Sequence, residues 1–291
     1  MKKEKLLFIG LGDIACRVCA LIDLERYDLF GLCRSKRDLS TTLSINCLQG
    51  DARDARNMQS VLAREFDVIV VVLTPDERSD KAYRQTYVES IQTLITELKH
   101  PLLRGPRLIL FVSSTRVYGQ NEGEWVDEFS QTRPSSFAGI RLREAELALL
   151  HSQLNSCVVR FSGIYGGNER HLMQEVKQGI GCARFPEHYT NRIHRDDCAG
   201  VLLHLIERSK EAKALSPLYL ATDCEPASMW DVKHWMADQL GLPKSHLRQV
   251  ADEGSRRSSK RCSNRLLLET GYQFRYPSFR QGYQFVIQSI S

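Results

Sequence analysis

Short apolar runs alternate with amphipathic segments along the first half of the chain. The runs cover residues 5–10, 28–33, 67–73, 107–112 and 156–161. Runs without polar alternation are typical of strands buried on both faces of a parallel sheet. Between them, apolar residues recur at helical spacing, as in Ile14, Val18, Leu21 and Ile22, and in Tyr83, Tyr87, Ile91, Leu94, Ile95 and Leu98. This alternation predicts an α/β fold, a Rossmann-type doubly wound parallel sheet.

In the last third of the chain, the hydrophobic pattern predicts a mixture of helices and short strands. There, SMWDVKHWMADQLGLP predicts a helix that Ser228 caps and that ends at Gly241, before Pro243. We expect residues 1–165 to form a dinucleotide-binding domain and residues 166–291 to form mainly a small C-terminal α/β substrate domain. The chain is expected to return to the first domain near residues 190–222. With no long linker, the two should enclose a cleft.

Composition and charge limit the classes of function. The chain has 291 residues, of which 42% are hydrophobic and 26% charged, as in an ordinary globular protein. No apolar run approaches the roughly 18 residues of a membrane span, and residues 1–13 reach Gly and Asp too soon for a secretory signal. A cytoplasmic protein without a membrane partner is expected. The net charge of +5 is spread along the chain except at residues 255–265, so a nucleic-acid partner is not expected either.

The cysteines indicate neither a disulfide framework nor a metal site. There are nine, an odd number at irregular spacing. Cys16 and Cys19 have no second pair at zinc-like spacing. We expect reduced thiols on a helix.

Two glycines follow the first apolar run, in the segment FIGLGDIA. Gly10, Gly12 and Ala15 match the pattern G-x-G-x-x-G/A, directly after a predicted strand and before a predicted helix. Gly10 would allow the tight turn, and Gly12 would let a pyrophosphate approach the backbone. The helix that begins near Asp13 would offer its positive end to the anion. This context favours a dinucleotide cofactor over glycines that serve only a turn.

A basic segment, LCRSKRD, ends the second predicted strand, where dinucleotide folds usually offer an acid to the adenosine ribose. Arg34, next to Ser35, could hold a 2′-phosphate through two parallel hydrogen bonds, and Lys36 or Arg37 adds positive charge. The segment therefore favours NADP. NAD stays open, as does a solvated basic turn with no ligand.

Five motifs in order resemble one family. FIGLGDIA, GLCRS, SSTRVYG, VVRFSGIYGG and NRIHRDDCAG together look like the extended short-chain dehydrogenase/reductases of the NAD-dependent epimerase/dehydratase type. The likeness extends over almost the whole chain, because residues 217–243 and 258–283 are similar to the family's small C-terminal substrate domain. Each motif alone is weak, whereas the ordered set is specific.

The resemblance implies roles for the hydroxyls of SSTRVYG. Ser114 takes the position that hydrogen-bonds the substrate carbonyl or alcohol, with Ser113 and Thr115 as supporting residues. A hydroxyl at a rigid strand end can both donate and accept a hydrogen bond, although such a cluster can also merely cap the strand. The complete set of predicted cofactor-binding residues is Gly10, Gly12, Asp13, Ile14, Arg34, Ser35, Asp51, Leu73, Thr74 and Ser113.

The family's catalytic acid, a Tyr with a Lys four residues later, is missing. If Phe137 occupies the Tyr position, Arg141 occupies that of the Lys. If Glu146 is matched to the family's later Glu instead, the two positions fall on Ala138 and Leu142. Neither alignment supplies a phenol, so the ordinary proton transfer does not follow from the sequence.

Other side chains could compensate for that loss. Tyr118, Tyr165 and His194 lie in motifs that the family places near its cleft, and of these we predict Tyr118 as a catalytic candidate beside Ser114. Packing is the alternative role for both tyrosines. The His194 motif mainly anchors the C-terminal domain in the family, with Asp196 or Asp197 capping the next helix. Arg160 could bind an anionic substrate or form an internal ion pair.

Three functions stay open. The first is an NADP-binding oxidoreductase or sugar-nucleotide epimerase/dehydratase-like protein without the usual Tyr-x-x-x-Lys pair. The second is a catalytically silent NADP-binding regulatory or sensor protein, and the third is a scaffold with a vestigial site. The expected partner is a small-molecule substrate, a sugar nucleotide or another carbonyl compound, and a homodimer stays open.

Overall fold

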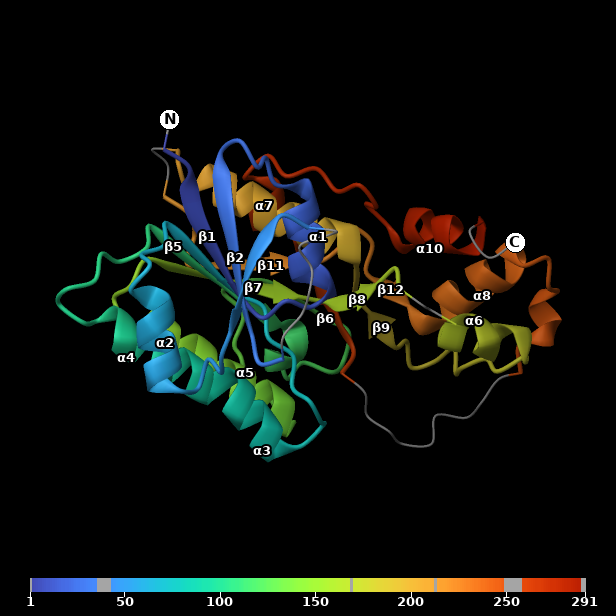
Figure 1. Ribbon diagram of the computed structural model, residues 1–291. Coiled ribbons are helices and arrows are strands. Elements are labelled where there is room, and N and C mark those ends of the chain that lie inside the picture. The colour runs from blue at the N-terminus through green and yellow to red at the C-terminus, as the bar shows by residue number, and fades with distance from the viewer. Residues whose placement is uncertain (1, 36–42, 168–169, 212–213, 249–257, 289–291) are drawn as a thin grey trace. The chain divides into compact units, whose positions relative to one another are not determined.

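A seven-stranded sheet forms the centre of the computed structural model (Figure 1), which describes residues 2–35, 43–167, 170–211, 214–248 and 258–288. In spatial order its strands are β11 (Leu218–Ala221), β7 (Ser156–Phe161), β5 (Leu108–Ser114), β4 (Val68–Val71), β1 (Glu4–Ile9), β2 (Tyr27–Cys33) and β3 (Ile45–Gln49). β1 pairs in parallel with β2 and β4, β2 with β3, and β4 with β5. The strand order reverses direction between β1 and β4, which confirms the predicted doubly wound α/β fold.

Two strands of this sheet were not among the predicted apolar runs. In β3, at one edge of the sheet, only Ile45 is buried, while Asn46 and Cys47 are exposed. A strand that is not buried on both faces lacks the continuous apolar run of a central parallel strand. β11 is fully buried but only four residues long.

Helices cover both faces of the sheet. α1 (Asp13–Leu21) and α7 (Arg195–Arg208) lie on one face, and α2 (Ala55–Leu62), α4 (Ser90–Leu98) and α5 (Phe137–Leu150) on the other (Figure 1). The buried residues of α1 are Ala15, Val18 and Cys19. The predicted apolar face of this helix was therefore wrong at Leu21, which is 55% exposed.

The predicted helix across residues 83–98 contains an irregular turn. It consists of α3 (Asp80–Tyr83), a π-helical segment (Arg84–Glu89) and α4, which follow one another without a break. The hydroxyl of Ser90 donates to the carbonyl of Gln85, five residues earlier, at 3.5 Å. π-helical turns are rare and occur frequently at functional sites.

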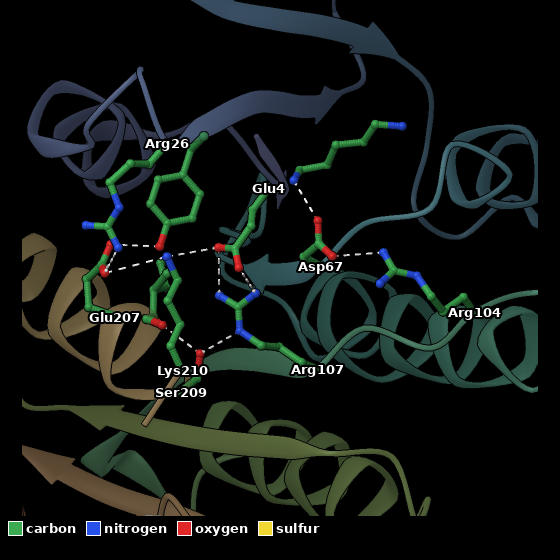
Figure 2. Close-up of polar contacts among 11 residues, drawn as sticks. Glu4, Arg26, Asp67, Arg104, Arg107, Glu207, Ser209 and Lys210 are labelled. Carbon is green, nitrogen blue, oxygen red and sulfur yellow. Dashed lines mark hydrogen bonds and ion pairs between the residues drawn. The ribbon is translucent and has the colours of Figure 1, made fainter. Parts of the chain in front are cut away.

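A network of ion pairs and hydrogen bonds joins the carboxyl end of α7 to the amino ends of β1, β2 and β5 (Figure 2). Glu4 accepts hydrogen bonds from Arg107 at 3.0 and 3.2 Å and pairs with Lys210 at 3.0 Å. Glu207 accepts from Arg26 at 2.8 Å and from the hydroxyl of Tyr27 at 2.7 Å. A single partly exposed ion pair contributes little to the stability of a fold. Here the pairs share partners and so form a network, which can contribute more.

The chain divides into two compact units. The first comprises residues 1–117, 134–160 and 199–219, and the second residues 118–133, 161–198 and 220–291. The core of the second unit is apolar and includes Val176, Val232, Met236, Phe279 and Tyr283.

Short elements build the second unit. Its strands pair as β8 (Gly163–Tyr165) with β10 (Arg192–His194), β9 (Tyr189–Thr190) with β12 (Ala227–Ser228), and β6 (Glu124–Val126) with β13 (Lys260–Cys262). Its α-helices are α6 (Arg170–Lys177), α8 (Met229–Gln239), α9 (Arg265–Leu268) and α10 (Phe279–Gln288). Short 3₁₀ turns cover Thr115–Val117 in the first unit and Lys244–His246 in the second. Ser228 caps α8 as predicted, because its hydroxyl accepts the amide of Asp231 at 3.0 Å.

Candidate functional site

The two glycines after β1 have different surroundings. Gly10 has a φ of +99°, and a Cβ there would lie 2.2 Å from the carbonyl oxygen of Val72. Gly12 is the N-cap of α1, no side chain caps that helix, and a Cβ at Gly12 would meet no heavy atom within 4 Å. The protein's own packing therefore requires glycine at position 10. At position 12 the space in front of the backbone is open, which fits the close approach of an anionic ligand to a helix N-terminus.

A pocket of about 340 Å³ opens next to these glycines, within the first unit. Among the predicted cofactor residues, those that line it are Gly10, Gly12, Arg34, Ser35, Asp51, Leu73 and Thr74. Asp13 and Ile14 lie in the first turn of α1 and are not part of the lining. Lys36 and Arg37 lie outside the described residues. The lining thus comes from the carboxyl ends of neighbouring strands, where ligands bind in open α/β sheets.

Two ion pairs lie at this pocket. Arg34 donates to both carboxylate oxygens of Asp76, each at 2.5 Å. Arg53 donates to Asp51 from Nε at 3.0 and 3.1 Å and from Nη2 at 2.5 Å. The hydrogen bond from Arg34 lowers the pKa of Asp76, and that from Arg53 lowers the pKa of Asp51. All four side chains line the pocket, and sequence reasoning missed Arg53 and Asp76.

Another side of the pocket comes from the irregular helix. Ala82, Gln85, Thr86 and Ser90 line it, and they belong to α3, the π-helical segment and α4. The only signal for them in the sequence was that they lie between the apolar positions of a predicted amphipathic helix. The side of an amphipathic helix that lies between its apolar positions ordinarily faces water. Nothing in the sequence therefore distinguished these pocket residues from ordinary surface residues.

Ser113 has a buried structural partner. Its hydroxyl donates to Glu146 of α5 at 2.6 Å. The same carboxylate accepts from Arg160 of β7, from Nε at 2.9 Å and from Nη2 at 2.7 Å. Arg160 therefore forms the internal ion pair that was one of its two expected roles. Ser113 is not among the residues that line the pocket.

Ser114 lies at the end of β5 and is half-buried. Its oxygen accepts the amide of Arg116 at 3.3 Å. Thr115 is buried and begins a 3₁₀ turn. A hydroxyl that accepts one hydrogen bond still has its proton to donate, so the geometry of Ser114 leaves it able to orient a carbonyl oxygen.

One face of α5 passes through Ala138, Leu142 and Glu146, which are at most 3% exposed. This face carries Glu146 to Ser113 and Arg160, and residues four apart on a helix lie on the same side. In the alignment that matches Glu146 to the family's later Glu, Ala138 and Leu142 take the Tyr and Lys positions. Neither side chain can transfer a proton.

Phe137 and Arg141 contact α3 instead. The ring of Phe137 packs edge-on against Tyr83, with ring centroids 5.4 Å apart. Arg141 donates to Asp80 at 2.8 and 2.9 Å and to Glu144 at 2.8 Å. These two side chains thus join α5 to its neighbouring helix.

The tyrosines considered as replacement acids are both buried. Tyr118 donates its hydroxyl to the carbonyl of Asp127 at 2.6 Å. Burial raises the pKa of Tyr165 far above its ordinary value, and its ring packs 4.7 Å from that of Tyr283. A phenol that exchanges a proton near neutral pH needs a lowered pKa, so Tyr165 has the wrong electrostatic environment for an acid catalyst.

His194 directly precedes α7 and accepts a hydrogen bond from the first turn of that helix. Its Nδ1 accepts the amide of Asp196 at 3.2 Å. The expected cap by Asp196 or Asp197 was wrong, because α7 begins at Arg195 and both residues lie inside its first turn. Asp197 instead accepts the amides of Arg275 and Tyr276, at 2.7 and 2.9 Å.

The described residues offer neither a metal site nor a membrane-spanning helix. That part of the chain contains no group of three His, Cys, Asp or Glu side chains placed to hold a metal ion. It also has no helix of sufficient length and hydrophobicity to cross a bilayer. All nine cysteines of the sequence lie among the described residues, and none of them forms a disulfide.

Known proteins with similar sequences or structures were compared with the chain. No family model matches it. Methionine adenosyltransferase 2 subunit beta from Xenopus tropicalis is 27% identical over 153 residues, which is 50% of this chain and 46% of that protein, so the match spans about half the length of this curated relative. A protein from Methylobacillus flagellatus assigned as an NAD-dependent epimerase/dehydratase has a structure with a TM-score of 0.78, at 28% identity over 99% of both chains.

Two further solved structures share the fold and were obtained with a dinucleotide. UDP-glucuronic acid 4-epimerase from Bacillus cereus, in complex with NAD, has a TM-score of 0.75 at 15% identity and covers 96% of this chain and 94% of its own. Human epimerase family protein SDR39U1, with NADPH, has a TM-score of 0.73 at 17% identity and covers 96% of this chain and 97% of its own. At such identities the likeness shows the fold alone.

Proposed function

On the premise that the chain has the fold of the extended short-chain dehydrogenase/reductases of the NAD-dependent epimerase/dehydratase type, we propose that it binds a nicotinamide dinucleotide. The expected form is NADP(H), and the binding site is the pocket beside Gly10 and Gly12. The observation that carries this proposal is the open space in front of Gly12, at the uncapped start of α1. A side chain at Gly12 would fill the space at the start of α1 that a pyrophosphate needs, and Gly12 also lines the pocket.

The chain's own residues have distinct roles in this proposal. The first-turn amides of α1 and the backbone of Gly12 would hold the pyrophosphate. Arg34 and Ser35 would lie toward the adenosine ribose, where Arg34 could contact a 2′-phosphate. Leu73 and Thr74 would flank the dinucleotide at the end of β4. When bound, the nicotinamide supplies or accepts a hydride.

The proposal includes slow or absent reduction of ordinary carbonyl or keto-sugar substrates. A hydride added to a carbonyl leaves an alkoxide that needs a proton, and positioned proton transfer contributes roughly 10²- to 10⁴-fold in rate. Ser114 could orient the oxygen, but the α5 face with Ala138 and Leu142 offers no proton. We therefore favour a dinucleotide-binding protein of low catalytic activity.

A regulatory role is the second candidate function. It is favoured by the relative from Xenopus tropicalis, whose name makes it the beta subunit of an adenosyltransferase. In that role, dinucleotide occupancy would act on a partner protein, and catalysis would not be needed. If the protein is instead a slow oxidoreductase, the names of several structures of the same fold favour a sugar nucleotide as the substrate.

A pair of matched substitutions tests the cofactor site. Gly12→Leu should abolish NADPH binding measured by calorimetry, while the circular dichroism spectrum and melting temperature stay those of the parent. Gly105→Leu is the control, because a Cβ at Gly105 also meets nothing within 4 Å and Gly105 lies outside the pocket. Equal NADPH affinity in the Gly12 variant and the parent would refute the proposed site.

Turnover assays separate the low-activity proposal from an ordinary enzyme. We expect the parent to reduce a panel of ketones and keto-sugar nucleotides far below the ordinary rate of about 10 per second. Turnover at the ordinary rate, lost in Ser114→Ala, would show that a replacement acid exists. The low-activity proposal would then be wrong, although the cofactor site would stand.

A further inference from the structure

The guanidinium of Arg34 is already occupied. Both of its terminal nitrogens donate to the carboxylate of Asp76, at 2.5 Å each. A phosphate group bound by Arg34 through two parallel hydrogen bonds would need these same donor groups. Asp76 and Arg34 both line the pocket, so the competing carboxylate lies at the binding site itself.

The nearby charges do not relieve this competition. Arg53, the other arginine among the residues that line the pocket, is held by Asp51 through its side chain, and its backbone amide donates to the same carboxylate at 2.9 Å. The part of the lining that comes from described residues therefore carries two cations and two anions. Against these residues, a 2′-phosphate would meet a balanced set of charges instead of a surplus of positive charge.

The pair of Arg34 and Asp76 can open. The side chains are 52% and 66% exposed, and exposed ion pairs contribute little to stability because water solvates the separated charges. If a phosphate takes the fork of Arg34, Asp76 is left as a carboxylate beside the new anion. The repulsion between like charges then opposes the contact that Arg34 makes.

From this geometry we infer that Asp76 is a specificity-determining residue, which lowers the affinity of the pocket for the 2′-phosphorylated dinucleotide relative to the unphosphorylated one. Asp76 acts by competing for Arg34 and by its own charge. The inference rests on the proposed function, since it requires that a dinucleotide binds in this pocket. It implies that the preference for NADP over NAD is smaller than Arg34 alone would produce.

Substitution of Asp76 by Asn tests the inference. Asn has a similar size but no charge, so it cannot form the charged two-bond pair with Arg34. Dissociation constants for NADP⁺ and NAD⁺ are measured by calorimetry on the parent, Asp76→Asn, Arg34→Ala and the double variant. In Asp76→Asn we expect the ratio of the NADP⁺ constant to the NAD⁺ constant to fall by about threefold, as for the loss of one solvent-exposed like charge. In the Arg34→Ala background the same substitution should change the ratio less.

Glu77→Gln is the matched control. Glu77 is the next residue, is exposed, and bonds to Ser79 and not to Arg34. Its removal changes the net charge by the same amount and should leave the ratio unchanged. An unchanged or increased ratio in Asp76→Asn, or an equal fall in Glu77→Gln, would overturn the inference while the proposed function stands. A parent that binds neither dinucleotide would overturn both.

Discussion

Replacing Glu146 by Gln is expected to destabilise the protein by about 3 kcal/mol, at the lower end of the range for breaking a buried ion pair. The side chains of Glu146 and Arg160 are 0% and 2% exposed, so water cannot solvate a charge left without its counter-ion. Gln keeps the volume and one acceptor oxygen, and therefore one of the hydrogen bonds at 2.7 and 2.9 Å. It loses the negative charge that balances the guanidinium.

Urea unfolding followed by circular dichroism measures this loss, with each transition fitted separately if the two units unfold apart. Glu144→Gln is the control on the same helix, because Glu144 is 39% exposed and pairs with Arg141 three residues earlier. That change should cost about 0.5 kcal/mol or less. In the double variant Glu146→Leu, Arg160→Met, much of the lost stability should return, because no charge is buried. If Glu146→Gln were as stable as Glu144→Gln, the pair would not be the buried interaction described above.

Two further predictions concern titration and catalysis. Burial raises the pKa of Asp223 to about 8 from an ordinary value of 3.8, so the folded state holds a proton that the unfolded chain releases, and stability falls as the pH rises through this range. Asp223→Asn cannot ionise, so its melting temperature relative to the parent should increase from about pH 5 to pH 9, and a constant difference would contradict the raised pKa. The double substitution Phe137→Tyr, Arg141→Lys should leave carbonyl reduction unchanged, since both side chains contact α3. A clear gain in NADPH oxidation would show that this face of α5 reaches the substrate.

The sequence predicted those features that depend on local rules. Gly10 and Gly12 were found because a tight turn and a close ligand approach require glycine at fixed positions after a strand. The central strands were found because burial on both faces demands a continuous apolar run. The strand β3 escaped the same rule because it is not buried on both faces, and only Ile45 in it is buried.

Pairings between distant residues could not be predicted. Arg34 was placed correctly at the end of β2, but its partner Asp76 follows β4. The two can meet because β2 and β4 both pair in parallel with β1 and therefore end at the same edge of the sheet. The alignment of α5 was ambiguous for a similar reason. A spacing of four residues fits Phe137 with Arg141 and Ala138 with Leu142 equally well, and no local rule in the sequence chooses between them.

The π-helical segment sets the rotational phase between α3 and α4. One extra residue in a turn rotates everything before it by about 100° relative to a regular α-helix. Deleting one residue from Arg84–Glu89 would restore that regular helix and turn α3 away by the same angle, so that Asp80 would leave Arg141 and Ala82 would leave the pocket. The length of this turn, more than the identity of its side chains, therefore determines whether α3 belongs to the site.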